Sequence, residues 1–330
     1  MKKRKIGPFE VNPIGLGCMG LSAFYGPPTD HADAVRLLRR AVDLGVDHFD
    51  TAELYGRNEE LLGEALEGLR GKIRIATKFG PKFQFDENGK RVGQTIDGSP
   101  ANMRRAVENS LRYLRTDHID LYYLHRLDPN TPVEETVGAM GELVKEGKVL
   151  AIGLSEVNGE TFAKANATHP VAAVQSEYSI FTRDVETVLF DQLRKAGATL
   201  VAYSPLGRGM LTGSFSRDHK PGGQGEFRSG DMQPRWAEGA YEANLALVEE
   251  VKAIAAEAGA TPGQVALAWV LSRGEDIVTI PGTTKLKNLE DNLAAAKVTL
   301  SEDQLKRLEP LADKVQGARY NEMGMAAVNR

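Results

Sequence analysis

The chain has 330 residues, of which 42% are hydrophobic and 26% are charged, and its formal net charge at pH 7 is −4. These values are ordinary for a soluble globular protein with a large core, and the mild acidity offers no basic field to attract a nucleic-acid backbone. The single cysteine, Cys18, excludes an internal disulfide and a metal site built from several thiolates.

The basic start, residues 2–5, resembles the first part of a signal peptide. No apolar stretch follows it, because Gly7, Pro8, Glu10 and Pro13 interrupt the sequence. No later apolar run is long enough to span a bilayer. We therefore expect a cytoplasmic protein with neither a membrane nor a nucleic acid as its partner.

Short apolar runs alternate with amphipathic stretches along most of the chain. The runs are rich in Val, Ile and Leu without clean alternation, which is typical of buried parallel strands, and the stretches between them have a helical period. Strands are predicted near 14–17, 46–50, 73–78, 119–125, 149–154, 171–175, 198–203 and 277–280, and helices near 30–44, 58–69, 101–115, 133–147, 159–167, 184–196, 240–273 and 286–296. Eight such units predict either a closed α/β barrel or an open doubly wound sheet.

Two connections between these elements are long, and both follow a strand. Residues 80–100 contain a turn signal at 86–89, and residues 205–239 are rich in Gly, Arg and Pro. In a barrel, loops that follow strands lie on the catalytic face. Loops of this length are usually functional or disordered, so we expect these two near the active site.

The C-terminal part of the chain carries one more predicted helix, near 301–311, and then a tail without a clear period. Barrels commonly exceed 250 residues as one unit. We therefore expect a single domain over residues 1–330, with the tail at about 313–330 packing over or near the active face.

Residues 15–20 read Gly-Leu-Gly-Cys-Met-Gly and match the dinucleotide fingerprint GxGxxG. That fingerprint requires a helix that opens at the glycines and turns its N-terminus to a pyrophosphate. Two prolines, Pro27 and Pro28, follow instead, and the segment before them has no helical period. We prefer to interpret these residues as a first strand with a tight exit.

Polar side chains stand at the ends of three neighbouring predicted strands. Asp50 ends the second strand, Lys78 the third and His125 the fourth, and Tyr55 follows the second strand by five residues. Each has a structural explanation when taken singly: a helix cap, a solvated strand end, a core histidine and a loop aromatic. The carboxyl ends of neighbouring barrel strands converge, however, and a buried ammonium is costly unless it is paired, so together they favour catalysis.

These residue types suit the reduction of a carbonyl group, which needs a hydride on carbon and a proton on oxygen. A free tyrosine, with a pKa of about 10, is a poor acid at neutral pH. We expect Lys78, held by Asp50, to lower the pKa of Tyr55. His125 would orient the carbonyl and stabilise the developing charge on its oxygen.

The set Asp50, Tyr55, Lys78 and His125 resembles, in order and spacing, the catalytic tetrad of the aldo-keto reductases. The segment DTAELYG at 50–56 resembles that family's first signature, residues 120–125 its second, and residues 280–292 its cofactor-phosphate signature. The resemblance covers nearly the whole chain and is closest to the pyridoxal reductase and channel β-subunit side of the family. It implies a single (β/α)8 TIM barrel with long loops on its C-terminal face, and an NADP(H)-dependent reductase of aldehydes or ketones.

The resemblance also implies which residues hold the cofactor. Ser155 and Gln175 match positions that bind the nicotinamide carboxamide, and Tyr203 matches the aromatic that stacks on the nicotinamide. Positions along the pyrophosphate are matched by Ser204, Leu206, Gly207 and Gly209, and positions around the adenosine phosphate and adenine by Gly282, Thr283, Lys285, Asp291 and Asn292. Two residues depart from the family: Glu156 stands where many relatives have Asn, and Asn288 where many have an arginine near the adenine.

Two other functions stay open at this point. One is a Schiff-base aldolase on the same barrel with Lys78 as its nucleophile, since a fold alone does not fix a function. The other is a cofactor-binding regulatory subunit for a protein partner, as the potassium-channel β-subunits of this family are.

No metal site is expected, because the histidines are scattered and form no HExxH motif. Substrate choice should depend on Tyr25, residues 80–100 and Tyr320, and neither the carbonyl compound nor the oligomeric state can be read from the sequence.

Overall fold

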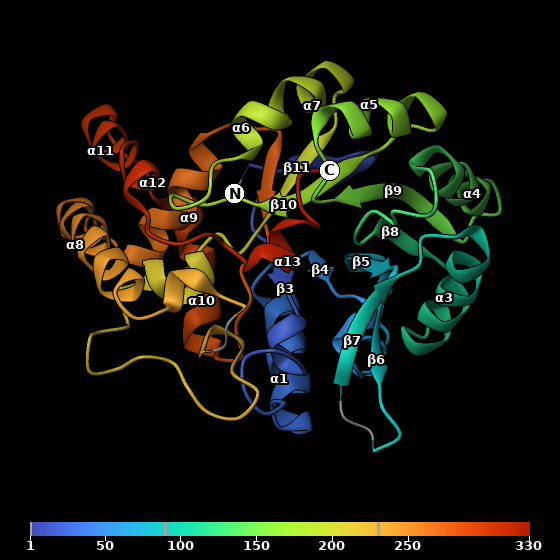
Figure 1. Ribbon diagram of the computed structural model, residues 1–330, viewed down its shortest axis with the longest axis horizontal. Helices are drawn as coiled ribbons and strands as arrows, with labels where there is room; N and C mark the ends of the chain where they lie inside the picture. The colour runs from blue at the N-terminus through green and yellow to red at the C-terminus, as the bar shows by residue number, and fades with distance from the viewer. Residues whose placement is uncertain (1, 89–90, 230–231) are drawn as a thin grey trace.

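Eight parallel strands form the central sheet of the computed structural model, which describes residues 2–88, 91–229 and 232–330. Their order is β12-β11-β10-β9-β8-β5-β4-β3. The two edges meet, because Ile14 bridges to Thr279 and Gly17 to Gly282 in the parallel sense. The sheet is therefore closed into a barrel with helices outside it (Figure 1), which confirms the predicted (β/α)8 fold.

All eight barrel strands fall within or beside the predicted segments. They are β3 Leu16–Gly17, β4 His48–Asp50, β5 Arg74–Phe79, β8 Ile119–Leu124, β9 Val149–Ser155, β10 Ala173–Glu177, β11 Thr199–Tyr203 and β12 Ile277–Thr279. The closing seam explains the glycine at the end of β3. A Cβ added to Gly17 would lie 2.6 Å from the Ile280 carbonyl oxygen, so only glycine allows the first and last strands to approach.

The outer helices follow the predicted order, with a few exceptions. They are α1 His31–Asp43, α2 Asn58–Ala65, α3 Pro100–Tyr113, α4 Val133–Lys145, α5 Gly159–Thr168, α6 Val185–Val188, α7 Phe190–Ala196, α8 Ala240–Ala258, α9 Pro262–Ser272, α10 Leu286–Ala294, α11 Glu302–Leu308, α12 Leu311–Lys314 and α13 Glu322–Met325. The helix expected over 184–196 is divided into α6 and α7, and α12 and α13 were not predicted. Only the short 3₁₀ helix Met19–Leu21 follows the glycines of residues 15–20. The dinucleotide-fingerprint interpretation of those residues is therefore wrong.

The stretch predicted as one helix over 240–273 is two helices. Gly259 adopts a left-handed conformation, φ 60°, and ends α8. Thr261 then caps α9, and its side chain accepts from the Gln264 backbone N–H. Pro262 occupies the first turn of the helix. The apolar period continues across the break because both helices pack on the same core.

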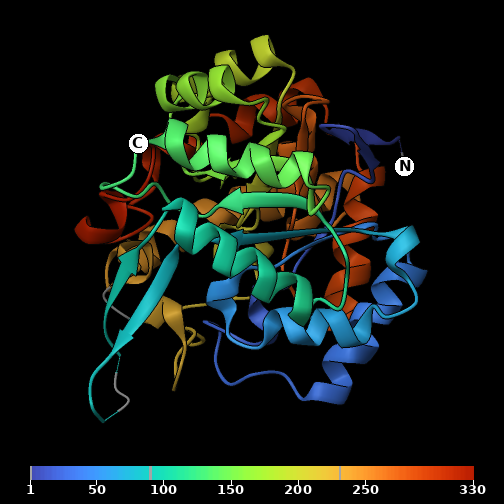
Figure 2. The same ribbon diagram turned by 90° about the vertical axis from the view of Figure 1, so that its right-hand side faces the viewer.

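A hairpin that the sequence did not predict plugs the N-terminal end of the barrel. Its strands, β1 Arg4–Ile6 and β2 Phe9–Val11, pair antiparallel. Ile6, Phe9 and Val11 pack against the inward side chains of the barrel strands. The chain's N-terminus and its C-terminal tail lie at opposite ends of the molecule (Figure 2).

Residues 80–100, predicted as a loop, contain a second hairpin. Its strands, β6 Pro81–Phe85 and β7 Arg91–Ile96, pair antiparallel with a register shift between Gln84 and Phe85. The hairpin projects from the barrel (Figures 1 and 2). The turn expected at 86–89 includes Gly89, which lies outside the described residues.

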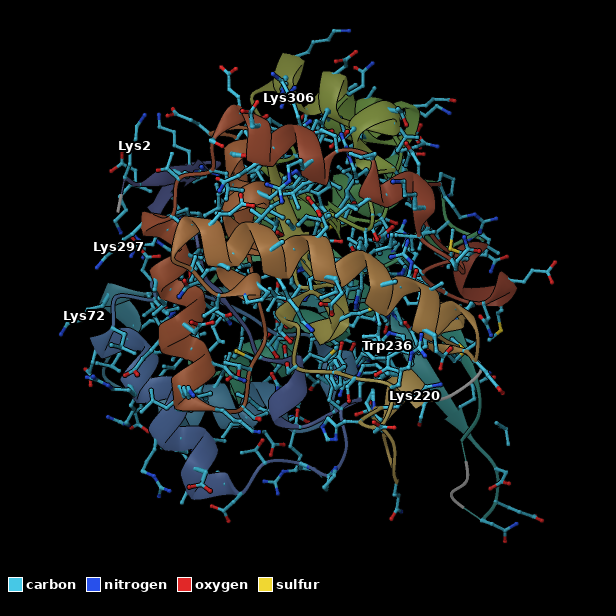
Figure 3. All side chains as sticks on the ribbon, turned by 90° about the vertical axis from the view of Figure 1, so that its left-hand side faces the viewer. Lys2, Lys72, Lys220, Trp236, Lys297 and Lys306 are labelled. Atoms are coloured by element: carbon cyan, nitrogen blue, oxygen red, sulfur yellow. The ribbon has the colours of Figure 1, made fainter. Side chains whose placement is uncertain are left out.

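The described parts of the 205–239 segment contain only short 3₁₀ turns, Gly207–Thr212, Phe227–Ser229 and Pro234–Trp236. Trp236 fastens the end of the segment to α8, with its ring stacked on Tyr241 at a centroid distance of 5.6 Å. Figure 3 shows Trp236 beside the start of that long helix. Within the part of the chain that the structure describes, no helix is long and apolar enough to span a membrane.

Candidate active site

Asp50 and Lys78 form an ion pair at the carboxyl ends of β4 and β5. Asp50 is in register with Ala76, so Lys78 lies two residues further along the neighbouring strand. The Lys78 Nζ donates to Asp50 Oδ1 and, at 2.8 Å, to the Thr51 carbonyl oxygen. Lys78 has no exposed surface, so its charge depends on these two partners.

Tyr55 stands in the 3₁₀ turn Glu53–Tyr55 directly after β4. Ser22 Oγ donates to the Tyr55 carbonyl oxygen at 2.8 Å, and Asn58 Nδ2 donates to Ser22 Oγ at 2.7 Å, which fixes the turn. Lys78 Nζ lies 5.2 Å from the centroid of the Tyr55 ring. The His125 ring stands edge-on to the same ring, with centroids 5.9 Å apart. The four predicted residues are therefore brought together around one phenol.

The surroundings of Tyr55 favour its protonated form. Burial raises the pKa of Tyr55 well above its usual value, the negative charge of Asp50 raises it further, and Arg126 opposes both. The expectation that Lys78 gives Tyr55 a lowered pKa is therefore wrong for this structure. Burial disfavours the phenolate, and the negative charge of Asp50 adds to that effect.

His125 is held in its neutral form. Burial lowers the pKa of His125 well below its usual value, and the positive charges of Arg126 and Lys78 lower it further. The His125 backbone N–H donates to the Phe79 carbonyl oxygen at 2.9 Å, which continues the β5–β8 pairing to this residue. A neutral imidazole can donate one N–H to a carbonyl oxygen without adding a charge to the pocket.

An aromatic wall that the sequence did not reveal faces Tyr55. The Phe24 ring contacts the Tyr55 ring, with their centroids 6.2 Å apart. Phe83 and Phe227 pack in turn against Phe24, at 6.3 and 5.8 Å between centroids. These three rings come from the β3–α1 connection, the β6–β7 hairpin and the 205–239 segment. The three phenylalanines are far apart in the sequence, so the cluster could not be predicted from it. Only the folded loops bring the rings together.

Arg126 is a polar residue that the sequence analysis also missed, although it directly follows His125. Its Nη1 donates to the His125 carbonyl oxygen at 2.8 Å and to Ser155 Oγ at 3.0 Å. The guanidinium is thus oriented toward the end of β9. Its position next to a strand-end histidine was the only signal available in the sequence.

The three residues assigned to the nicotinamide end lie on adjacent strands, β9, β10 and β11. Ser155 ends β9 and contacts Arg126, and Gln175 Nε2 donates to Asp50 Oδ2 at 2.7 Å. The Tyr203 hydroxyl lies 2.9 Å from the Tyr320 hydroxyl of the tail. An amide, a hydroxyl and an aromatic ring are therefore side by side next to the Asp50–Lys78 pair.

The residues assigned to the pyrophosphate follow β11 in a tight turn. Ser204, Gly207 and Gly209 all have positive φ, at 48°, 56° and 96°. Leu206 starts the 3₁₀ segment Gly207–Thr212 and packs against the main core. The glycines let the backbone turn with little side-chain bulk, as a backbone cradle for an anion requires.

The residues assigned to the adenosine end surround the start of α10. Gly282 bridges to Gly17, Thr283 Oγ1 accepts from the Lys285 backbone N–H at 3.1 Å, and Lys285 occupies the N-cap. Asp291 has a structural task, because its carboxylate accepts from Thr261 and Gln264 of α9 at 2.9 and 2.8 Å. Asn292 is buried.

Glu156, the residue after Ser155 that departs from the family pattern, binds the C-terminal tail. Both of its carboxylate oxygens accept from Arg319 of the tail, at 2.8 and 2.9 Å. Both side chains are buried. Arg319 carried no role in the sequence analysis, because its partner is 163 residues away.

Among the described residues no cluster of three or more His, Cys, Asp or Glu side chains is placed to hold a metal.

Comparison with known proteins gives consistent results. A family model described as the aldo/keto reductase family matches residues 13–313. A probable aldo-keto reductase 1 of Glycine max is 43% identical over 319 residues, which are 95% of this chain and 90% of the relative.

Two solved structures have the same fold. The glycerol dehydrogenase AKR11B4 from Gluconobacter oxydans superposes with a TM-score of 0.84 at 28% identity, over 96% of this chain and 97% of the other. The holo form of the aldo-keto reductase AKR11C1 from Bacillus halodurans gives 0.76 at 26% identity, over 98% and 99%.

Proposed function

The chain belongs to the aldo/keto reductase family, and from this membership we propose that it reduces an aldehyde or ketone to an alcohol with NADP(H), using Tyr55 as the proton donor. Family membership supports oxidoreductase chemistry on carbonyl compounds. The finer assignment is carried by one observation: a phenol, a neutral imidazole and a buried ion pair converge at the carboxyl ends of β4, β5 and β8.

Each member of the tetrad has a distinct task in this proposal. Tyr55 donates its proton to the carbonyl oxygen. Its raised pKa keeps the phenol protonated at neutral pH but makes it a weaker acid, so the transfer depends on stabilisation of the phenolate that forms. Neutral His125 donates a hydrogen bond to the same oxygen and orients the carbonyl. Lys78 faces the phenol ring and stabilises the charge left on Tyr55 after the transfer, with Asp50 fixing the position of its ammonium.

The residues at the carboxyl end of the barrel fit a nicotinamide dinucleotide. When bound, the dinucleotide supplies the hydride. Gln175 keeps its amide oxygen available because its nitrogen is engaged by Asp50, and Tyr203 offers a ring at the end of β11. Helix α10 is nine residues long, and Lys285 is its N-cap residue. The N-terminus of such a helix suits a phosphate group.

The Schiff-base alternative is poorly supported by the geometry. A nucleophilic lysine needs a free amine that can reach a carbonyl carbon. The Lys78 Nζ instead donates to Asp50 and Thr51 and has no exposed surface. Burial lowers the pKa of Lys78 and the ion pair with Asp50 opposes that change, so it is the engaged and enclosed position of the Nζ that disfavours attack.

Reduction of a panel of aldehydes, ketones and sugars, followed by NADPH consumption, tests the proposal. We expect many turnovers per chain and an alcohol product at one equivalent per NADPH consumed. Tight NADPH binding with no more than a single turnover on any member of the panel would instead support the regulatory-subunit alternative. Borohydride trapping of a keto substrate on Lys78 would support the aldolase.

A further inference from the structure

Arg126 lies beside the reacting groups with much of its hydrogen-bonding capacity unused. Both of its hydrogen bonds start from Nη1 and end on neutral acceptors, the His125 carbonyl oxygen and Ser155 Oγ. Within the described part of the chain, its Nη2 and Nε make no hydrogen bond. Those two nitrogens form one edge of the planar guanidinium, which can hold both oxygens of a carboxylate or phosphate.

The positive charge of Arg126 also has no carboxylate partner among the described residues. Three arginines of the nearby loops and tail each have one: Arg208 pairs with Glu177 at 2.8 Å, Arg319 with Glu156 at 2.8 Å and Arg228 with Glu226 at 2.7 Å. Arg126 is partly buried, and a guanidinium partly withdrawn from water without a directly bound counter-ion is unfavourable. Arg126 is therefore the arginine of this region that an external anion would stabilise.

The surroundings place this cation in the substrate pocket. Its guanidinium hydrogen-bonds to the His125 carbonyl oxygen and to Ser155 Oγ, so it lies at the carboxyl ends of β8 and β9 beside the tetrad. Its charge also contributes to the lowered pKa of His125 and opposes the raised pKa of Tyr55. Phe24 contacts the same phenol ring, and Phe83 and Phe227 pack against Phe24. The pocket thus combines an apolar, aromatic cluster with one positive charge that no carboxylate of the described residues pairs with directly.

We propose that Arg126 is a specificity-determining residue that selects carbonyl substrates carrying an anionic group, a carboxylate or a phosphate, near the carbonyl. This inference rests on the proposed carbonyl reduction and adds a substrate class to it. The anion pairs with the free edge of the guanidinium while the carbonyl oxygen faces Tyr55 and His125. A neutral substrate of the same shape leaves Arg126 unpaired and binds less tightly.

Matched pairs of substrates test this assignment with NADPH as the reductant. Phenylglyoxylate is compared with its methyl ester, and glyceraldehyde 3-phosphate with glyceraldehyde. We expect the wild type to prefer at least one anion over its neutral counterpart by about 10- to 100-fold in kcat/KM, the range of a hydrogen bond to a charged group. An advantage confined to one pair identifies the carboxylate or the phosphate as the group selected.

Three variants locate the preference. Arg126→Gln should remove most of it, mainly by raising KM for the anion, and Arg126→Lys should retain part of it because the charge remains. Arg194→Gln is the matched control, since Arg194 is already paired with Asp276 on the outer layer of the barrel, and it should leave the ratio of anion to neutral substrate unchanged.

Two results would overturn the inference and leave carbonyl reduction standing. One is equal efficiency of the wild type on both members of each pair. The other is an Arg126→Gln variant that loses activity equally on anionic and neutral substrates, as a purely structural contact to Ser155 predicts. No turnover of any of the four compounds by the wild type would count against this substrate class, and failure across the wider carbonyl panel would remove the proposed function itself.

Discussion

In the proposed reaction, Tyr55 and Lys78 have separate tasks in the pocket. Tyr55 holds the proton before the reaction, and Lys78 stabilises the phenolate that remains once the proton has been transferred. Burial and Asp50 raise the pKa of Tyr55, so the phenol is protonated before reaction. Burial lowers the pKa of Lys78, and the ion pair with Asp50 opposes that change. The ammonium is held in place whether or not the phenol is ionised, and its attraction is therefore greatest when the phenolate forms.

The first prediction concerns the Tyr55 hydroxyl. Tyr55→Phe should lower kcat by about 10²- to 10⁴-fold, because it removes the general acid. Binding of NADPH, measured by fluorescence titration, should stay nearly unchanged, since the hydroxyl is assigned to the carbonyl and not to the cofactor. Turnover near the wild-type rate would remove Tyr55 from its assigned role.

The second prediction concerns pH. Because the pKa of Tyr55 is raised and that of His125 is lowered, neither should titrate between about pH 6 and about pH 9. The rate of carbonyl reduction at saturating substrate should therefore be nearly flat over this range, whereas alcohol oxidation, which needs the phenolate, should rise with pH. A steep fall in reduction near neutral pH that disappears in Tyr55→Phe would show that the phenol has a lowered pKa instead.

At the scale of elements, the C-terminal tail is fastened over the ends of the strands by buried charges. Arg319 binds Glu156 beyond β9, and Tyr320 contacts Tyr203 at the end of β11. The Arg208 guanidinium lies 4.7 Å from the centroid of the Tyr320 ring. The tail and the 205–239 segment are thus joined next to the proposed nicotinamide site.

The third prediction is that Arg319→Gln releases the tail. It leaves the Glu156 carboxylate buried without its partner, which typically costs about 3–5 kcal/mol. Hydrogen exchange at residues 317–330 should accelerate sharply, while exchange in the barrel strands should change little. The double variant Glu156→Gln with Arg319→Gln should recover part of the protection, since no unpaired charge remains. Equal protection in wild type and single variant would show that other contacts hold the tail.

The fourth prediction concerns the 205–239 segment, which is proposed to close over the cofactor pyrophosphate. Its described turns include Gly207 and Gly209 in left-handed conformations, and glycine has much backbone freedom to lose. Exchange of its amides should slow when NADP is added. The β6–β7 hairpin serves as the internal reference, and unchanged exchange in the segment at saturating NADP would contradict the clamp.

The elements also show which features of the fold are legible in the sequence. Buried parallel strands carry continuous apolar runs, and strand-end residues such as Asp50 and Lys78 follow from those runs directly. The hairpin near Phe83 was missed because long polar stretches hide its alternation. The Glu156–Arg319 pair and the aromatic wall could not be predicted, because they join segments whose relative position only the closed barrel determines.

At the scale of the whole molecule, closure of the barrel brings the first and last strands together at the proposed cofactor site. The bridge between Gly17 and Gly282 lies just before α10. The exit of β3 and the phosphate-binding end of α10 are therefore parts of one surface. Residues more than 260 positions apart in sequence thus contribute to the same site.

The last prediction follows from the charges of that surface and concerns the choice between NADPH and NADH. Sites that select NADH usually present a carboxylate to the ribose hydroxyl. Here the carboxylate of Asp291 is occupied by Thr261 and Gln264, and Glu290 lies 3.9 Å from Arg40. Lys285 at the N-cap of α10 is exposed, so its ammonium is available to bind the additional phosphate of NADPH.

We therefore expect the protein to use NADPH in preference to NADH. Lys285→Ala should raise KM for NADPH about tenfold, the effect of roughly 1.4 kcal/mol, and should barely change KM for NADH. Lys287→Ala, one residue into the same helix, is the matched control and should have a smaller effect. Because Asn288 stands where many relatives have an arginine, the preference should rest mainly on Lys285 and the helix N-terminus. Equal kcat/KM with both cofactors in the wild type would refute this assignment without affecting the tetrad, because the adenosine end of the cofactor is remote from Tyr55.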